Sequence, residues 1–305
     1  MRTPSIGIIG TGWVGASVAI SALQAGVAQE VLLFDARDGL AEGEAMDLAH
    51  GAAYYPSAQV RAGSLAEMRD TQAIVITAGK GGAPGQSRLD LLKENLGILR
   101  NIALQLRGYQ GIVVIVSNPI DVLVFDFTQA SGLPPERVIG TGTMLDTARL
   151  RQILGQRLAL DPRSIHAQLV GEHGDSEVVL WSGAEVGGVA LRRWAGWTPA
   201  DEEHIAHQVR RAAYEIIQRK GSTNHAIGLV TADLLHGMLH GERRVLTVTR
   251  VQTGALGLHG VALSLPTIVS AEGAVQVLEP AMDAQERAAL EKSADVLRAA
   301  IASVA

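Results

Sequence analysis

Short runs of apolar, mostly β-branched residues recur through the first half of the chain, and segments of helical length separate them. Each run is apolar at nearly every position, which is typical of a strand covered on both faces of a parallel sheet. The predicted strands are residues 6–10, 30–35, 73–77, 112–118 and 137–140. The pattern therefore predicts an α/β fold in which helices cover both faces of a doubly wound parallel sheet of Rossmann type.

The pattern changes near residue 142. A helix is expected over 144–158, followed by strand-like runs at 166–170 and 177–182. Two long helices, two alternating strands of antiparallel type and a closing helix follow, over 201–219, 225–240, 244–251, 260–270 and 283–302. We therefore predict two domains, a dinucleotide-binding domain over 1–142 and an α+β catalytic domain over 143–305.

Composition narrows the class of protein. The 305 residues carry 26 Lys and Arg against 31 Asp and Glu, and only 4% are aromatic, which argues against a nucleic-acid or membrane surface. Cysteine is absent, which excludes disulfides, thiolate nucleophiles and cysteine-ligated metals and fits a reduced, cytoplasmic setting. No apolar run is long enough to cross a membrane.

Gly10, Gly12 and Gly15 form a G-x-G-x-x-G motif directly after the first predicted strand. Such glycines let the backbone approach a pyrophosphate at a helix N-terminus. Asp35 ends the second strand, where a carboxylate can hold ribose hydroxyls and repel a 2′-phosphate, so NAD is favoured over NADP. Arg37 keeps that preference from being absolute. The alternative is a tight turn beside a loop-capping aspartate.

His173 lies in "GEHGDSE", a glycine-flanked turn between two predicted strands, where it is well placed to face a cleft. A structural role is the alternative. Metal ligation with Glu172 or Asp175 is disfavoured, because neighbouring side chains in a short turn rarely converge on one ion, and we expect no metal. Asp146 and Arg149 share one face of the predicted helix, and their alternative is an ordinary surface ion pair.

Together these motifs resemble the L-lactate and malate dehydrogenase family over essentially the whole chain, and the bacterial lactate enzymes most. The matching segments, in family order, are "GTGWVG", Asp35, "MDLAHG", the glycine loop ending in Arg88, "SNPID", "LDTARLR", "GEHGDSE" and "KGST". Glu172, and Thr223 in "KGST", resemble lactate rather than malate enzymes. The resemblance implies an NAD-dependent L-lactate dehydrogenase of glycolysis.

The resemblance also implies residue roles. His173 would carry the proton, Asp146 would fix its tautomer, and Arg149 would bind the substrate carboxylate with a guanidinium fork. Asn118 would contact substrate and the nicotinamide ribose, although an asparagine before a proline is common in turns. Substrate contacts are implied at Arg88, Asn118, Arg149, Thr223 and Gly82. Cofactor contacts are implied at Gly10, Gly12, Val14, Gly15, Asp35, Gly79 and Asn118.

Arg88 closes the stretch "TAGKGGAPGQSR", which holds four glycines and a proline. A lid of this composition would bring the cation to the carbonyl oxygen only after substrate has entered, and would expel water. The alternative is a flexible surface loop with an incidental arginine.

The same loop departs from the family at Gly82, where lactate enzymes carry glutamine and malate enzymes arginine. Loss of the arginine removes the counter-charge for a second carboxylate, and loss of the glutamine leaves space for bulkier substrates. Lys80 could swing inward and restore malate activity. We rank pyruvate first, a longer or broader 2-oxo acid second and oxaloacetate third.

Arg151 and His166 match the positions where bacterial lactate dehydrogenases bind fructose 1,6-bisphosphate between subunits. The resemblance thus implies a homotetramer, or a dimer, with an allosteric site between subunits. The alternative is that Arg151 and His166 are ordinary surface residues of a helix and a strand.

An NAD-dependent glycosidase is disfavoured because it uses a cysteine. A non-catalytic NAD sensor would have no need of Arg88, Asp146, Arg149 and His173 together. A crystallin-like structural role is a further alternative, which a turnover assay distinguishes.

Overall fold

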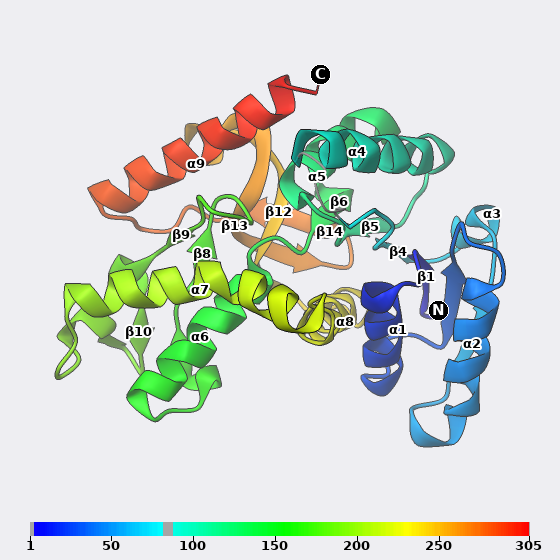
Figure 1. Ribbon diagram of the computed structural model, residues 1–305, viewed down its shortest axis with the longest axis horizontal. Coiled ribbons are helices and arrows are strands. Elements are labelled where there is room, and N and C mark those ends of the chain that lie inside the picture. Colours follow the sequence, from blue (N-terminus) through cyan, green and yellow to red (C-terminus); the bar gives the residue numbers. More distant parts are fainter. Residues whose placement is uncertain (1–2, 82–87, 305) are drawn as a thin grey trace.

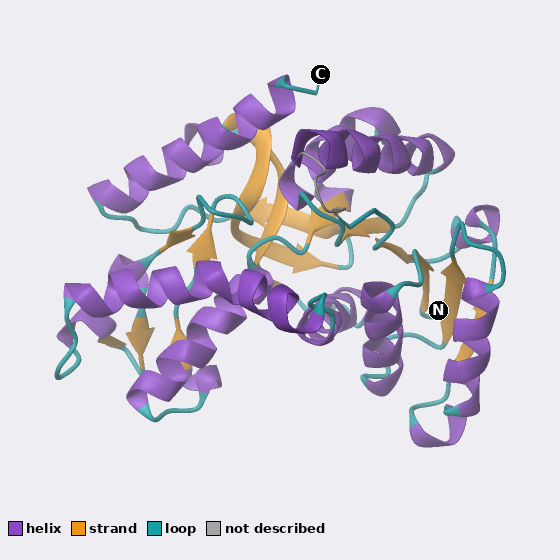
Figure 2. Cartoon of the chain, in the orientation of Figure 1, coloured by secondary structure: helices purple, strands orange, loops and turns teal. Residues whose placement is uncertain are grey.

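A computed structural model describes residues 3–81 and 88–304, without the side chain of Arg88. Its central feature is a nine-stranded sheet in the order β14-β13-β12-β6-β5-β4-β1-β2-β3 (Figures 1 and 2). The six strands from β3 to β6 run parallel, in the order of a dinucleotide-binding Rossmann sheet. These strands are β1 (Ser5–Ile9), β2 (Glu30–Phe34), β3 (Gln59–Ala62), β4 (Ala73–Ile76), β5 (Ile112–Ile115) and β6 (Val138–Gly140). The predicted fold class is confirmed.

Helices cover both faces of this sheet because successive strand side chains point to opposite faces and both sets are apolar. In β4, Ile74 and Ile76 enter the core on one face, while Ala73 and Val75 enter the core on the other. Helices α4 and α5 lie over the first face and α1, α2 and α8 over the second (Figure 1). The helices of this half are α1 (Trp13–Gln24), α2 (Leu40–His50), α3 (Leu65–Met68), α4 (Arg88–Gln105) and α5 (Ile120–Ser131).

The sheet continues across the change of pattern near residue 142. Three antiparallel strands, β12 (Arg244–Thr253), β13 (His259–Ser270) and β14 (Gly273–Val277), extend it beyond β6. They join where Thr249 of β12 pairs with Gly140 of β6. The carboxyl end of β6 and the middle of β12 therefore meet, which brings the two halves of the chain together at one edge.

Helices α6 and α7 lie beside this junction and enclose a third apolar core with short strands between them. The other two helices of this half, α8 and α9, pack into the two cores of the large sheet. Capping boxes begin two of the long helices, with Thr198 and Asp201 at α7 and Asp283 and Glu286 at α9. The helices are α6 (Met144–Leu158), α7 (Pro199–Lys220), α8 (His225–Leu239) and α9 (Ala284–Ala302). The short strands are β7 (Ile165–His166), β8 (Leu169–Val170), β9 (Val178–Val179), β10 (Glu185–Val186) and β11 (Val189–Ala190). Single 3-10 turns occur at Ala52–Tyr54, Pro135–Arg137, Pro162–Ser164, Trp181–Gly183, Leu191–Arg193 and Ala255–Gly257.

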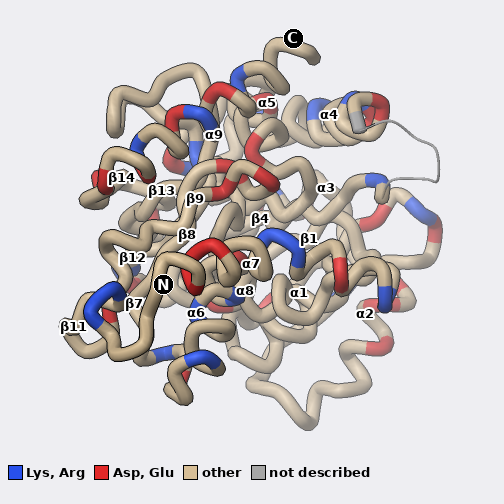
Figure 3. Tube along the Cα trace, turned by 60° about the vertical axis from the view of Figure 1, so that its left-hand side comes forward, with Lys and Arg blue, Asp and Glu red and all other residues tan. Residues whose placement is uncertain are grey.

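Charged residues of both signs are interspersed along the trace (Figure 3). Within the described ranges, no helix is both long enough and apolar enough to cross a membrane.

Candidate active site

The G-x-G-x-x-G turn forms a cradle between β1 and α1. Gly10 has a φ of 95°, and a Cβ there would lie 2.6 Å from the backbone nitrogen of Ala78. A Cβ on Gly15 would overlap the carbonyl oxygen of Gly10, so only glycine lets α1 approach the strand so closely. Gly12 is the N-cap of α1 and offers no side chain to its first N–H groups. The turn therefore fits a pyrophosphate held by backbone N–H groups.

Asp35 lies directly after β2, beside this cradle. Its carboxylate accepts hydrogen bonds from the backbone N–H groups of Thr11 (2.8 Å) and Arg37 (2.9 Å) and from Nε of Arg37 (3.2 Å). Burial raises the pKa of Asp35, but these hydrogen bonds outweigh burial and lower it overall. An ionised carboxylate at this place fits the two ribose hydroxyls of NAD and disfavours a 2′-phosphate.

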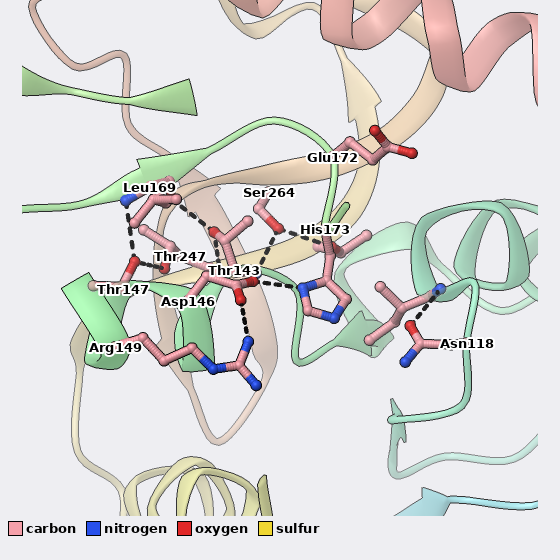
Figure 4. A network of polar contacts seen from close by, with 12 residues as sticks. Asn118, Thr143, Asp146, Thr147, Arg149, Leu169, Glu172, His173, Thr247 and Ser264 are labelled. Atoms are coloured by element: carbon pink, nitrogen blue, oxygen red, sulfur yellow. Dashed lines mark hydrogen bonds and ion pairs between the residues drawn. The ribbon is translucent and has the colours of Figure 1, made fainter. Parts of the chain in front are cut away.

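A buried acid and a guanidinium three residues apart on one helix meet an imidazole that lies 27 residues after the acid (Figure 4). Asp146 lies in the first turn of α6, and its Oδ2 is 2.5 Å from Nδ1 of His173, which lies between β8 and β9. Nη1 of Arg149 donates a 2.6 Å hydrogen bond to Oδ1 of the same carboxylate. Only 4% of the Asp146 side chain is exposed, against 24% for His173, so the imidazole is the accessible end of the pair.

Opposing effects set the proton affinity of the imidazole. Burial lowers the pKa of His173, but the charge and hydrogen bond of Asp146, with a smaller contribution from Asp121, raise it from 6.5 to about 9. Burial likewise raises the pKa of Asp146, yet the charges of His173 and Arg149 lower it overall. At neutral pH His173 is therefore a protonated imidazolium beside the ionised carboxylate of Asp146.

Asn118 lies on the side of the imidazole away from Asp146 (Figure 4). Its carbonyl oxygen accepts a 2.9 Å hydrogen bond from Nδ2 of Asn95, a buried side chain of α4. Oδ1 of Asn95 also accepts the backbone N–H of Lys80 (2.8 Å), so one amide joins the segments that follow β4 and β5. Sequence analysis missed Asn95, because nothing about an asparagine inside a helical pattern indicates which loops it reaches.

The structure brings several predicted residues together and leaves others apart. Hydrogen bonds join His173, Asp146 and Arg149 in one cluster, and Asn118 lies across the imidazole from it (Figure 4). The cofactor candidates Gly10, Gly12, Val14, Gly15, Asp35 and Gly79 lie at or just after the ends of β1, β2 and β4. Thr223 lies between α7 and α8, half-buried, with no hydrogen bond to that cluster among the described residues. Gly82 and the side chain of Arg88 lie outside the described part of the chain.

Arg151 and His166 lie apart from this cluster and close to each other. Nε of Arg151, on α6, donates a 3.0 Å hydrogen bond to the carbonyl oxygen of Ala167, next to His166 on β7. Arg151 is half-buried and His166 is exposed. Among the described residues, no three His, Asp or Glu side chains gather closely enough to hold a metal ion.

Comparison with known protein families decides what this arrangement represents. Residues 5–140 match the model of the lactate/malate dehydrogenase NAD-binding domain, and residues 143–305 match that of the α/β C-terminal domain of the same enzymes. The chain belongs to the lactate/malate dehydrogenase family. The resemblance seen in the sequence and the expected NAD cofactor are thereby confirmed.

Relatives within the lactate/malate dehydrogenase family match along the whole chain. L-lactate dehydrogenase from Clostridium perfringens is 38% identical over 99% of this chain and 98% of its own, and that from Moorella thermoacetica is 42% identical over 98% and 97%. Among solved structures, the minor L-lactate dehydrogenase from Enterococcus mundtii in its ligands-bound form superposes with a TM-score of 0.97 at 39% identity, covering 99% of both chains.

Proposed function

We propose that this protein is an NAD-dependent L-lactate dehydrogenase that reduces pyruvate to L-lactate and catalyses the reverse oxidation. The observation that carries the proposal is the buried Asp146–His173 pair, with Arg149 on the same carboxylate, at the side of the sheet where the glycine cradle lies. A non-catalytic NAD sensor has no need of this arrangement, in which a buried acid supports an accessible imidazole, and a turnover assay tests the crystallin-like alternative.

Proton transfer belongs to the chain's own residues. Bound NADH would be held by the Gly10–Gly15 cradle and Asp35, and supplies the hydride. Since Nδ1 of His173 faces Asp146, the proton for the keto oxygen is held at Nε2. Asp146 keeps the ring in this orientation and stabilises its positive charge. In lactate oxidation the neutral Nε2 takes the proton back.

Arg149 would bind the substrate carboxylate. Its Nη1 pairs with Asp146, which fixes the position of the guanidinium, and 14% of the Arg149 side chain is exposed. The guanidinium is therefore held in place and still accessible to a ligand. A planar guanidinium matches a carboxylate with two parallel hydrogen bonds. From the family resemblance we assign further contacts to Asn118 and Thr223, a lid-borne charge to Arg88 and the specificity position to Gly82.

The first prediction concerns substrate order. Nζ of Lys80 lies 3.2 Å from Oε2 of Glu94 on α4, an exposed ion pair that Lys80 would have to leave before it could meet a second substrate carboxylate. With glycine at position 82, we expect the highest kcat/KM for pyruvate, a lower value for 2-oxoisocaproate and the lowest for oxaloacetate. NADH oxidation with this panel of 2-oxo acids measures the order. Faster reduction of oxaloacetate than of pyruvate would contradict it.

The second prediction concerns activation. The short link from Arg151 to the main chain beside His166 supports a shared anion site, which a symmetry-related copy would complete. Fructose 1,6-bisphosphate should lower the pyruvate concentration for half-maximal rate, and Arg151→Gln should abolish that shift while leaving the maximal rate intact. Pyruvate saturation curves that superimpose with and without the sugar bisphosphate would contradict the proposal of an allosteric site.

Self-association, as a tetramer or a dimer, is part of the same proposal. It is supported by apolar side chains exposed on α1 and α2, where Trp13 is 61% and Met46 62% exposed. A hollow of about 530 Å³ opens beside them, between α1, α2 and the start of α8.

The proposal has two further parts. The chain would divide into two functional domains at residue 142. The protein would lie in the cytoplasm, which the lack of cysteine supports.

A further inference from the structure

A second buried carboxylate lies behind His173, on the main-chain side. Asp121 is the second residue of α5 and is 2% exposed. Its Oδ2 accepts the backbone N–H of His173 at 2.7 Å, and its Oδ1 accepts the hydroxyl of Thr249 at 2.6 Å. Both carboxylate oxygens of Asp121 therefore accept a hydrogen bond, and one of these bonds comes from the main chain of His173 itself.

The network continues from Asp121 to the start of α6. The hydroxyl oxygens of Thr249 and Ser264 lie 2.9 Å apart, and Ser264 Oγ accepts the backbone N–H of Thr143, the N-cap of α6, at 3.0 Å. All three side chains are fully buried. Gly142 has a φ of 48°, and a Cβ there would overlap both hydroxyls, so the network is closely packed. It connects His173 to the helix that bears Asp146.

Charge as well as geometry links Asp121 to the imidazole. Burial raises the pKa of Asp121 to about 6, against the opposing effect of the hydrogen bonds from Thr249 and His173; the charge of His173 also lowers this pKa, and that of Glu172 raises it. The charges of Asp146 and Asp121 in turn raise the pKa of His173, and that of Arg149 lowers it. The buried Glu177 also interacts with His173 and Asp146; burial and the charge of Asp146 raise the pKa of Glu177 to about 8. At neutral pH Asp121 is thus mostly ionised and adds negative charge near the ring.

We propose that Asp121 is a positioning residue for the dehydrogenase reaction, which fixes the main chain of His173 and favours the protonated imidazole through its negative charge. This inference rests on the proposed role of His173 as proton carrier. It assigns a function to the acid of the "SNPID" motif beyond its favourable place in the first turn of α5.

Asp121→Asn separates charge from geometry. An amide can accept the His173 N–H with its oxygen and donate to the Thr249 oxygen, whose own proton then turns to Ser264, so both contacts survive. We expect the pH at which half of kcat/KM for pyruvate is lost on the alkaline side to fall by about one unit. Below about pH 6, where Asp121 itself is protonated, the profiles of variant and wild type should converge.

Two further variants make the test decisive. Thr249→Val keeps the carboxylate of Asp121 but removes a hydrogen bond that stabilises its charge. The pH at which half of kcat/KM is lost should therefore fall by less than in Asp121→Asn. This variant tests the same role if Asp121→Asn does not fold. Asp295→Asn, on an exposed ion pair of α9, should leave the profile unchanged. A folded Asp121→Asn protein with the wild-type profile would overturn the inference.

Failure of this inference is distinguishable from failure of the proposed function. If His173→Gln retains wild-type turnover, the proposed function is wrong. If His173→Gln is inactive while Asp121→Asn and Thr249→Val both keep the wild-type pH dependence, only the role of Asp121 is wrong.

Discussion

Replacing Asp146 by asparagine is expected to lower kcat for pyruvate reduction by a factor on the order of 10³, because an asparagine behind a catalytic histidine favours the wrong tautomer. It should also remove the charge that raises the pKa of His173 to about 9. A raised pKa keeps the imidazole protonated up to that pH, so wild-type kcat/KM for pyruvate should fall only as pH rises through about 9. In the variant this fall should occur below pH 6.5. Steady-state rates between pH 5 and 10 measure both effects.

Asp126→Asn provides the control for this variant. Asp126 is a mostly buried carboxylate of α5 that pairs with Arg100 and makes no hydrogen bond to His173. Its loss should leave the pH at half-loss unchanged even if the protein is less stable. An Asp146→Asn enzyme whose alkaline limb stays near pH 9 would show that this carboxylate does not set the charge of the imidazole.

Replacing Arg149 by lysine is expected to raise KM for pyruvate by roughly 30- to 1,000-fold, equivalent to about 2–4 kcal/mol. Lysine keeps the positive charge beside Asp146 but cannot offer the planar pair of donors that a carboxylate accepts. NADH affinity should change less than twofold, since Asp35 and the glycine cradle are untouched. Fluorescence titration with NADH and saturation with pyruvate separate the two effects.

Arg157→Lys is the matched control, because Arg157 lies two turns further along α6 and pairs with Asp201 at the surface. Its KM for pyruvate should equal that of the wild type. Equal loss of pyruvate and NADH affinity in Arg149→Lys would instead indicate a general disturbance of α6. That result would contradict the role of Arg149 in binding the substrate carboxylate.

The sequence predicted the interior of the sheet well and its edges poorly. The strands β1, β2, β4, β5 and β6 are buried on both faces, so they read as continuous apolar runs. The edge strand β3 alternates exposed and half-buried positions in "QVRA", and the opposite edge strand β14 is largely solvent-facing at its end. Both strands are short and interrupted by polar or exposed positions, so neither stands out from a loop.

The family resemblance implied the proton-transfer pair, but not what surrounds it. His173 and Asp146 lie in motifs that match the family, whereas the contacts of Asp121 join residues 52 and 128 positions away along the chain. Such pairs form only because β12 extends the sheet beside β6. The junction rests on the pairing of Thr249 with Gly140, which no periodicity in the sequence reveals.

A ¹⁵N NMR titration of histidine-labelled protein reads the proton of His173 directly, with its resonances assigned by their loss in His173→Gln. We expect His173 to gain its second proton with a pKa of about 9, and Nδ1 to carry a proton at every pH because it faces Asp146. A His173 ring that titrates near 6.5, or whose Nδ1 is the nitrogen that loses its proton, would contradict the claim that Asp146 prepares this imidazole for proton transfer.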